Sequence, residues 1–362
     1  RVSFPSLRNA DSHIIKEVGL GIGRLKAIKA LCLESASFET ANFSSLAGFT
    51  SDWKACEPTF ILSLKLSGEI TNQIFQSIIQ NLKHLPRLEK LEFSTSSYGW
   101  LSGISNQEIE ALSRFLPRRL KSFRLNISRC QKVTRVGILN LLSPIGKMSS
   151  LQDISLKFSS QNGIHDEVIK QLSRCLNKQK GLESLFIEFG NCEMITESAM
   201  TQFLTFLPSN STLKSLMLSF LDFRKNLTDD GLGKLGVALA NLKRVETFAL
   251  NCDGCSGVTE SGINQLSIQL GSLEKSKKLL LSFRACFNIK GTISENLFKE
   301  LEKLKDLEYF ILDLRLCKRL KKKEVRKILP WSKSSKYKLA VYLSLDEEFL
   351  KTQRYRYLKF SY

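Results

Sequence analysis

The chain has 362 residues, 43% of them hydrophobic, and a formal net charge of +19. This hydrophobic content is ordinary for a folded soluble protein. No stretch approaches the roughly 18 unbroken apolar residues of a membrane-spanning helix, and the first residues contain no apolar run of the signal-peptide type. We therefore expect a folded soluble chain without a membrane span.

A leucine-rich pattern recurs along the chain with a period close to 31 residues. In the clearest copy, Leu185, Ile187 and Phe189 alternate as in a strand with one buried face. We call the residue at the place of Ile187 the strand landmark of its copy, and the landmarks are Leu33, Leu66, Phe93, Leu125, Leu156, Ile187, Leu218, Leu250, Leu281 and Leu312. The steps between them are 33, 27, 32, 31, 31, 31, 32, 31 and 31 residues. Such a period predicts a solenoid of stacked supersecondary units.

The units are expected to follow one another along residues 1–345, about eleven in all. Residues 11–33 already have the pattern of a helix and the following strand, so the first unit is expected to be incomplete, with a further segment upstream. A final strand is expected in Leu339–Leu345. Residues 346–362 are expected to form a C-terminal capping segment.

Within each unit, a helical pattern follows the strand after about seven residues, as at Ile263, Leu266, Ile268 and Leu270. Residues suited to helix N-caps stand at the junctions, namely Ser105, Thr134, Thr196, Thr228 and Thr259. Ser105 and Glu108 match the capping-box pattern. One strand and one helix per unit predict an α/β solenoid, with a parallel β-sheet on the concave face and helices on the convex face.

The Leu-x-x-Leu-x-Leu strands, the Cys positions after them and the Thr-x-x-Gly helix starts together resemble leucine-rich repeats of the ribonuclease-inhibitor class. The segments Thr228–Leu232 and Val258–Ile263 are also similar to cysteine-containing repeats associated with F-box proteins. The strand is two residues longer here, which resembles a long-period variant. The resemblance covers nearly the whole chain and implies a horseshoe-shaped binding scaffold, but no particular ligand.

Most of the nine cysteines follow the repeat. Cys130, Cys192, Cys255, Cys286 and Cys317 each stand five residues after a landmark, in the turn that leaves the strand. We interpret them as buried structural thiols in a reducing, intracellular compartment, with the cytoplasm favoured over the mitochondrion, cilium or nucleus. In Cys252-Asp253-Gly254-Cys255, Cys252 has the inward phase of Phe189. The lone CxxC lacks a second ligand pair, so we expect neither a metal site nor another cofactor.

Catalysis finds little support. The three histidines, His13, His84 and His165, lie in different repeats without a common phase, and a triad would have to bridge distant repeats. His165, beside Asp166, is interpreted as part of a helix start. We therefore predict that the chain is not an enzyme.

Two windows concentrate the positive charge. Residues 315–338 hold eleven basic residues against Glu324 alone, and residues 114–135 hold eight basic residues and no acidic one. In the first window we predict an anion-binding cluster of Lys318, Arg319, Lys321, Lys322, Lys323, Arg326 and Lys327. Lysines at a helix start oppose the helix dipole, so a functional reason is favoured. In the second window the candidate residues are Arg114, Arg118, Arg119, Lys121, Arg124 and Arg129.

The residue directly before each landmark is predicted to face outward from the sheet. In five consecutive repeats this position is apolar, and we predict a partner-binding stripe of Phe186, Met217, Ala249, Leu280 and Ile311. The alternatives are a phase error of one residue, or cover from a C-terminal segment of the same chain.

These patterns favour a non-catalytic scaffold, a subunit of a larger assembly, that docks a protein on the concave face and an acidic surface at the basic C-terminal end. Direct RNA or DNA binding through both basic windows is the first alternative. A repeat domain of a GTPase-activating protein or of a ubiquitin-ligase substrate receptor is the second. The oligomeric state stays open.

Overall fold

The computed structural model describes residues 2–4, 30–35, 61–66, single positions from 76 to 85, and 87–95, 104–205, 207, 212–290, 293, 295–317 and 338–343. The chain divides into two compact units, Arg1–Ser215 (unit 1) and Leu216–Tyr362 (unit 2).

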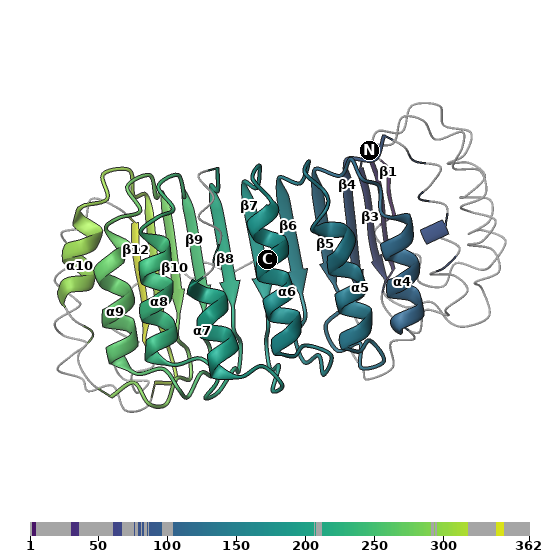
Figure 1. Ribbon diagram of the computed structural model, residues 1–362. Coiled ribbons are helices and arrows are strands. Elements are labelled where there is room, and N and C mark those ends of the chain that lie inside the picture. The colour runs from purple at the N-terminus through teal and green to yellow at the C-terminus, as the bar shows by residue number, and fades with distance from the viewer. Residues whose placement is uncertain are drawn as a thin grey trace. The chain divides into compact units, whose positions relative to one another are not determined.

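In unit 1 the strands lie side by side in chain order, and every pair of neighbours is parallel. Its described strands are β1 (Val2–Phe4), β2 (Ala30–Ser35), β3 (Ile61–Leu66), β4 (Lys90–Thr95), β5 (Ser122–Asn126), β6 (Asp153–Lys157) and β7 (Ser184–Glu188). Its described helices are α4 (Asn106–Phe115), α5 (Arg135–Ile145), α6 (Asp166–Lys178) and α7 (Glu197–Thr205). The helices pack along one face of these strands (Figure 1).

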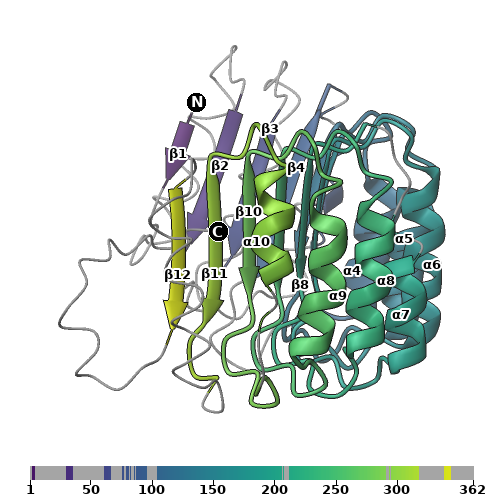
Figure 2. The ribbon, with the colours of Figure 1, turned by 90° about the vertical axis from the view of Figure 1, so that its left-hand side faces the viewer.

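Unit 2 continues the same alternation. Its described strands are β8 (Ser215–Ser219), β9 (Thr247–Asn251), β10 (Lys278–Ser282), β11 (Tyr309–Leu314) and β12 (Lys338–Leu343), and its described helices are α8 (Asp229–Leu239), α9 (Glu260–Leu270) and α10 (Glu295–Glu302). The strands again follow chain order, with parallel pairing from β9 to β12. Seen from the side, α8, α9 and α10 stand on one side of the strands only (Figure 2). The predicted α/β solenoid of leucine-rich repeats is confirmed.

The strand register corrects one landmark. Leu33 pairs with Leu64, and Leu64 pairs with Phe93. Leu64 therefore replaces Leu66, which turns the steps of 33 and 27 residues into 31 and 29. The error arose because a shift of two residues keeps every side chain on its own face, so apolar alternation cannot detect it.

At the ends of the series, β1 is a strand that the sequence prediction did not include, and β12 is one that it did. β1 pairs in register with β2, one strand before the first expected landmark. β12 is the strand expected in Leu339–Leu345, and Val341 is its landmark because it pairs with Leu312. The capping segment expected at 346–362 lies outside the described residues.

The core lies between the strands and the helices. Landmark side chains such as Ile187 and Leu281 are at most 1% exposed, as are the residues two positions further on, such as Phe189 and Phe283. Phe158 and Phe189 stack with their ring centroids 6.1 Å apart. The outer helix faces are less apolar. Ile268, which belongs to the predicted helical pattern, is nevertheless 54% exposed on α9.

The predicted cysteine positions are confirmed as structural. The thiols of Cys192, Cys255, Cys286 and Cys317 each donate to a backbone carbonyl oxygen of the preceding repeat, at 3.0–3.1 Å. Burial raises the pKa of Cys192 to about 12 and that of Cys317 to about 11. Cys252 is fully buried at the inward position, as the repeat phase predicts. In the described parts of the chain, the cysteines are not joined by disulfide bonds.

Helix starts connect consecutive repeats. Ser105 and Glu108 form the predicted capping box, in which the Ser105 N–H donates to Glu108 Oε2 at 2.8 Å. Acidic first residues of helices also reach the following repeat. Asp166 Oδ1 accepts from the Thr196 N–H at 2.8 Å, and Asp229 Oδ1 accepts from the Thr259 N–H at the same distance. Each of these carboxylates thus links the helix starts of two successive repeats.

The turn that leaves each strand has one recurring backbone conformation. The residue four positions after the landmark has a positive φ in seven repeats, namely at Arg129, Ser160, Asn191, Asp222, Gly254, Ala285 and Leu316. Only Gly254 among them adopts this left-handed region without a side-chain penalty. Its N–H donates to the Arg284 carbonyl oxygen at 2.8 Å, as the Ala285 N–H does to the Arg315 carbonyl oxygen. The inter-strand hydrogen bonds thus continue beyond the strands.

None of the helices within the described residues is long and apolar enough to cross a lipid bilayer.

Candidate functional site

The open face of the sheet, opposite the helices, carries the predicted apolar stripe. In unit 2 the register aligns Ala249, Leu280 and Ile311 and extends the same row to Ala340 on β12. We call these residues, with Met217 of β8, the middle row. Met217, Ala249, Leu280 and Ala340 are half-buried, whereas Ile311 is 8% exposed. The residues directly before the landmarks therefore lie on the open face, as predicted. The sequence prediction left out Ala340, although it lies in the expected final strand and directly precedes the landmark Val341.

The fifth predicted stripe residue, Phe186, lies in unit 1 on the open face of β7. It pairs in register with Ser155 and is half-buried. The Lys157 ammonium lies 4.8 Å from its ring centroid. A cation therefore covers part of this aromatic side chain.

The rest of the described open face of unit 1 is mainly polar and internally paired, apart from Ile61 on β3. Arg124 binds Asp153 at 2.8 Å, and Lys157 lies 3.8 Å from Glu188. The Ser63 hydroxyl donates to Glu92 at 3.0 Å. The two units therefore present different chemistry on the same side of their strands, and the apolar surface belongs to unit 2.

A row that the sequence prediction missed flanks the middle row at the N-terminal ends of the strands. Lys278, Tyr309 and Lys338 are register partners on β10, β11 and β12. The ammonium nitrogens of Lys278 and Lys338 lie 5.9 and 5.1 Å from the Tyr309 ring centroid. In the sequence, these three residues share the position three residues before a landmark. Their arrangement around Tyr309 could be recognised only once the register of β12 was known.

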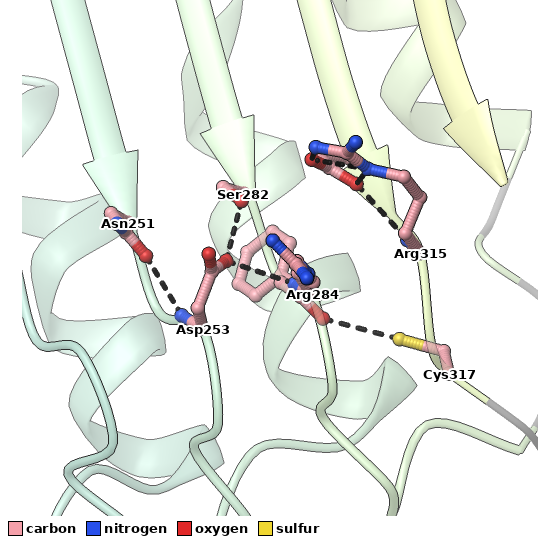
Figure 3. A network of polar contacts seen from close by, with 8 residues as sticks. Asn251, Asp253, Ser282, Arg284, Arg315 and Cys317 are labelled. Carbon is pink, nitrogen blue, oxygen red and sulfur yellow. Dashed lines mark hydrogen bonds and ion pairs between the residues drawn. The ribbon is translucent and has the colours of Figure 1, made fainter. Parts of the chain in front are cut away.

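At the C-terminal ends of the strands the face is polar. Asp313 is 2% exposed, and Arg315 binds it through two nitrogens, with Nε–oxygen distances of 2.9 and 3.0 Å. This pairing raises the pKa of Arg315. The guanidinium also lies 5.3 Å from the Tyr342 ring centroid. Arg315, a member of the predicted basic window, thus neutralises a buried carboxylate of its own repeat (Figure 3).

A second polar cluster ties β9 to β10. Asn251 Oδ1 accepts from the Asp253 N–H at 2.8 Å, and Asp253 Oδ1 accepts from the Arg284 N–H at 3.0 Å and from the Ser282 hydroxyl (Figure 3). Burial raises the pKa of Asp253, and the hydrogen bonds from Ser282 and Arg284 oppose this rise. Since the carboxylate is occupied by its own neighbours, the cluster is structural.

The second basic window, 114–135, does not form one surface. Arg114 lies on α4, Arg118 and Arg119 in the following turn, Lys121 before β5, Arg124 on the open face and Arg129 in the turn after β5. Several of its cations are already paired, because Arg114 binds Glu110 at 2.6 Å, and Lys121 binds Glu89 at 2.7 Å. Arg114 and Arg118 do share a groove of about 440 Å³ with Lys147 and Pro144 of the next repeat.

The predicted anion-binding cluster, Lys318, Arg319, Lys321, Lys322, Lys323, Arg326 and Lys327, lies outside the described residues. Of its window, the structure describes Arg315, Cys317 and Lys338 among others at the two ends. Lys338 is exposed on β12.

Among the described residues, no group of three His, Cys, Asp or Glu side chains is placed to hold a metal ion. His165 occupies the N-cap position of α6 without a capping hydrogen bond from its side chain. His13 and His84 lie outside the described residues.

No protein-family model and no curated protein sequence matches this chain. Many solved structures are similar to it, including the following two. One is the leucine-rich repeat-containing protein LegL7 from Legionella pneumophila, with 14% identity, coverage of 84% of this chain and 97% of that chain, and a TM-score of 0.44. The other is the tropomodulin C-terminal domain from Caenorhabditis elegans, with 13% identity, coverage of 45% and 92%, and a TM-score of 0.33. Since both scores are below 0.5, the assignment of the fold depends on the repeat geometry itself.

Proposed function

Starting from the leucine-rich-repeat solenoid, we propose that this chain is a non-catalytic scaffold, a subunit of a larger assembly, that docks a partner protein on the open face of unit 2. The observation that carries the proposal is the middle row, whose half-buried apolar side chains have no helix over them among the described residues. Contiguous apolar surface of this kind on a folded protein commonly marks a partner site. Phe186, on unit 1, is likewise proposed as a partner contact.

The structure supports this choice over the helix side of the molecule. On the helices of unit 2, Val237 and Ile268 are 60% and 54% exposed at equivalent positions of α8 and α9, but the exposed Lys299 occupies that position on α10. On the open face, by contrast, apolar residues follow one another on neighbouring strands about 4.8 Å apart. Such a row can cover the side chains of an extended or helical partner segment.

The experiment is native purification with cross-linking mass spectrometry, repeated with Met217→Asp and Leu280→Asp. We expect each to abolish partner co-purification while the circular dichroism spectrum is retained. Val237→Asp and Ile268→Asp place the same charge on exposed apolar positions of the helices and should leave co-purification unchanged. A partner that is retained by the first pair of variants would refute the docking face.

The proposal includes an acidic surface of the partner at the basic end, held by the Lys318–Lys327 cluster. Neutralising Lys321, Lys322 and Lys323 together should weaken the complex and reduce its salt dependence. It also includes a reducing intracellular compartment, which the buried cysteines without disulfide bonds support among the described residues.

Nucleic-acid binding by the basic windows is the outcome to test against. It predicts an affinity that falls steeply with salt, because phosphate contacts release counterions. The dispersal and internal pairing of the cations in 114–135 weigh against it. A GTPase-activating or ubiquitin-ligase receptor domain has no specific support from the described residues.

A further inference from the structure

The lysines beside Tyr309 form a preorganised pair of cations on the open face of unit 2. Lys278 and Lys338 flank Tyr309 from the two neighbouring strands, so their Cα atoms are about 10 Å apart, twice the strand spacing. Lys338 Nζ also donates to the Tyr309 hydroxyl oxygen at 3.5 Å. Because the hydroxyl oxygen accepts from Lys338, the hydroxyl proton stays available for another acceptor.

Neither lysine has a carboxylate within 4.0 Å among the residues that the structure describes. The acidic residues nearby are engaged at the adjacent position instead. Glu246 binds Lys277 at 2.8 Å, and Glu246, Glu308 and Asp306 all raise the pKa of Lys277. Glu246 therefore pairs with Lys277, whereas Lys278 and Lys338 have no such carboxylate partner among the described residues.

The middle row begins two residues further along each strand. Leu280, Ile311 and Ala340 lie about 7 Å from the lysine row, the repeat distance of a strand face. Ile311 is the buried floor, and Leu280 and Ala340 remain half-exposed on either side of it. Cationic and aliphatic surface thus adjoin at a fixed spacing.

We propose that this face binds an acidic–aliphatic segment of a partner protein, with a carboxylate held by Lys278, Lys338 and the Tyr309 hydroxyl and an aliphatic side chain on Leu280, Ile311 and Ala340. A separation of about 7 Å corresponds to residues two apart in an extended segment, and residues three or four apart on a helix lie at about 5–6 Å. The inference rests on the proposed docking function and names the chemistry of its partner.

A single-stranded nucleic acid fits the same cations less well. Bases bind such surfaces by stacking on exposed aromatic faces. Tyr309 has an ammonium group on each side, and the next row is aliphatic. The phosphate could meet the lysines, but the bases would cover no aromatic platform.

The test is a selection of random displayed peptides, each about a dozen residues long, on the immobilised full chain. We expect selected peptides to contain Asp or Glu two to four positions from Leu, Ile or Val. By fluorescence anisotropy, the double variant Lys278→Glu/Lys338→Glu should weaken the best synthetic peptide by at least about tenfold. Lys278→Arg/Lys338→Arg retains both charges and should keep the affinity within about twofold.

Lys243→Glu/Lys299→Glu is the matched control. It makes the same change in net charge at two exposed lysines away from the open face, and the affinity should not change. We call the proposed binding of a carboxylate by Lys278, Lys338 and Tyr309 the clamp. The clamp is refuted if no peptide is selected, or if the selected peptides show no preference for acidic residues. It is also refuted if Lys278→Glu/Lys338→Glu binds the peptide as well as the unchanged chain does, or if a single-stranded oligonucleotide of similar length binds more tightly. If Leu280→Asp loses the peptide but charge reversal does not, the docking face stands without the clamp. If Leu280→Asp keeps it, the docking function itself fails.

Discussion

The left-handed turn after each strand gives opposite predictions at two equivalent positions. Ala285 has a φ of 58°, and Gly254, in the preceding repeat, has a φ of 75°. A side chain in this region costs about 1 kcal/mol or more, and the greater freedom of glycine in the unfolded chain offsets part of the gain. Ala285→Gly should therefore raise the free energy of unfolding by about 0.5 kcal/mol. Gly254→Ala should lower it by about 1 kcal/mol or more, since its new Cβ would also lie 3.2 Å from Asp222 Cα.

Urea unfolding followed by circular dichroism measures both changes, with the slope of the transition checked for constancy because repeat arrays can unfold in parts. Ala238→Gly is the control, since it makes the same substitution inside α8 and should cost about 1 kcal/mol. If Ala285→Gly destabilises the protein as much as Ala238→Gly does, the left-handed turn contributes no strain and the reasoning is wrong.

Three further outcomes follow from the buried groups. Because the folded pKa of Asp253 is raised, stability should fall as the pH rises from the ordinary value near 3.8 through the folded pKa, and Asp253→Asn should flatten this part of a pH series of urea midpoints. With pKa values of about 12 and 11, Cys192 and Cys317 should resist iodoacetamide at pH 8 until urea is added, as mass spectrometry of the labelled peptides would show. Phe283→Ala should cost about 3–5 kcal/mol, whereas Phe287→Ala, at a side chain that is 49% exposed, should change the urea midpoint little; similar losses would contradict the assigned core.

The fold could be predicted from the sequence because the same spacing of apolar residues recurs in each repeat. Ten landmarks in one phase leave few ways to pair the strands, and the buried cysteines follow the same count. The prediction went wrong at β3, where Leu62, Leu64 and Leu66 alternate and no neighbouring cysteine fixes the phase. Ile268 was included in the apolar pattern of its helix, but its side chain is exposed. Single apolar residues also occur on exposed helix faces, so the pattern alone does not identify the buried ones.

Only part of the candidate site could be predicted from the sequence. The middle row could be predicted because outward residues follow from alternation alone. The pair of lysines around Tyr309 could not, because it depends on β12 standing next to β11, with Lys338 opposite Tyr309. The pairing of Arg315 with Asp313 was hidden as well, since only the fold shows that Asp313 is buried.

Charge in such a chain has to be counted along the repeat rather than along the sequence. A window of some twenty residues crosses a helix, a turn, a strand and another turn, so its cations disperse over different surfaces, as they do in 114–135. Residues one repeat apart lie side by side instead. The position four residues before the landmark pairs Glu89 with Lys121, Glu183 with Lys214, and Glu246 with Lys277, at 2.7–2.9 Å. In the adjacent row, three residues before the landmark, Lys278 and Lys338 lie on the two sides of Tyr309 and have no carboxylate within 4.0 Å among the described residues. We propose that this pair of cations, rather than the net charge, is what would favour an acidic partner on the open face of unit 2.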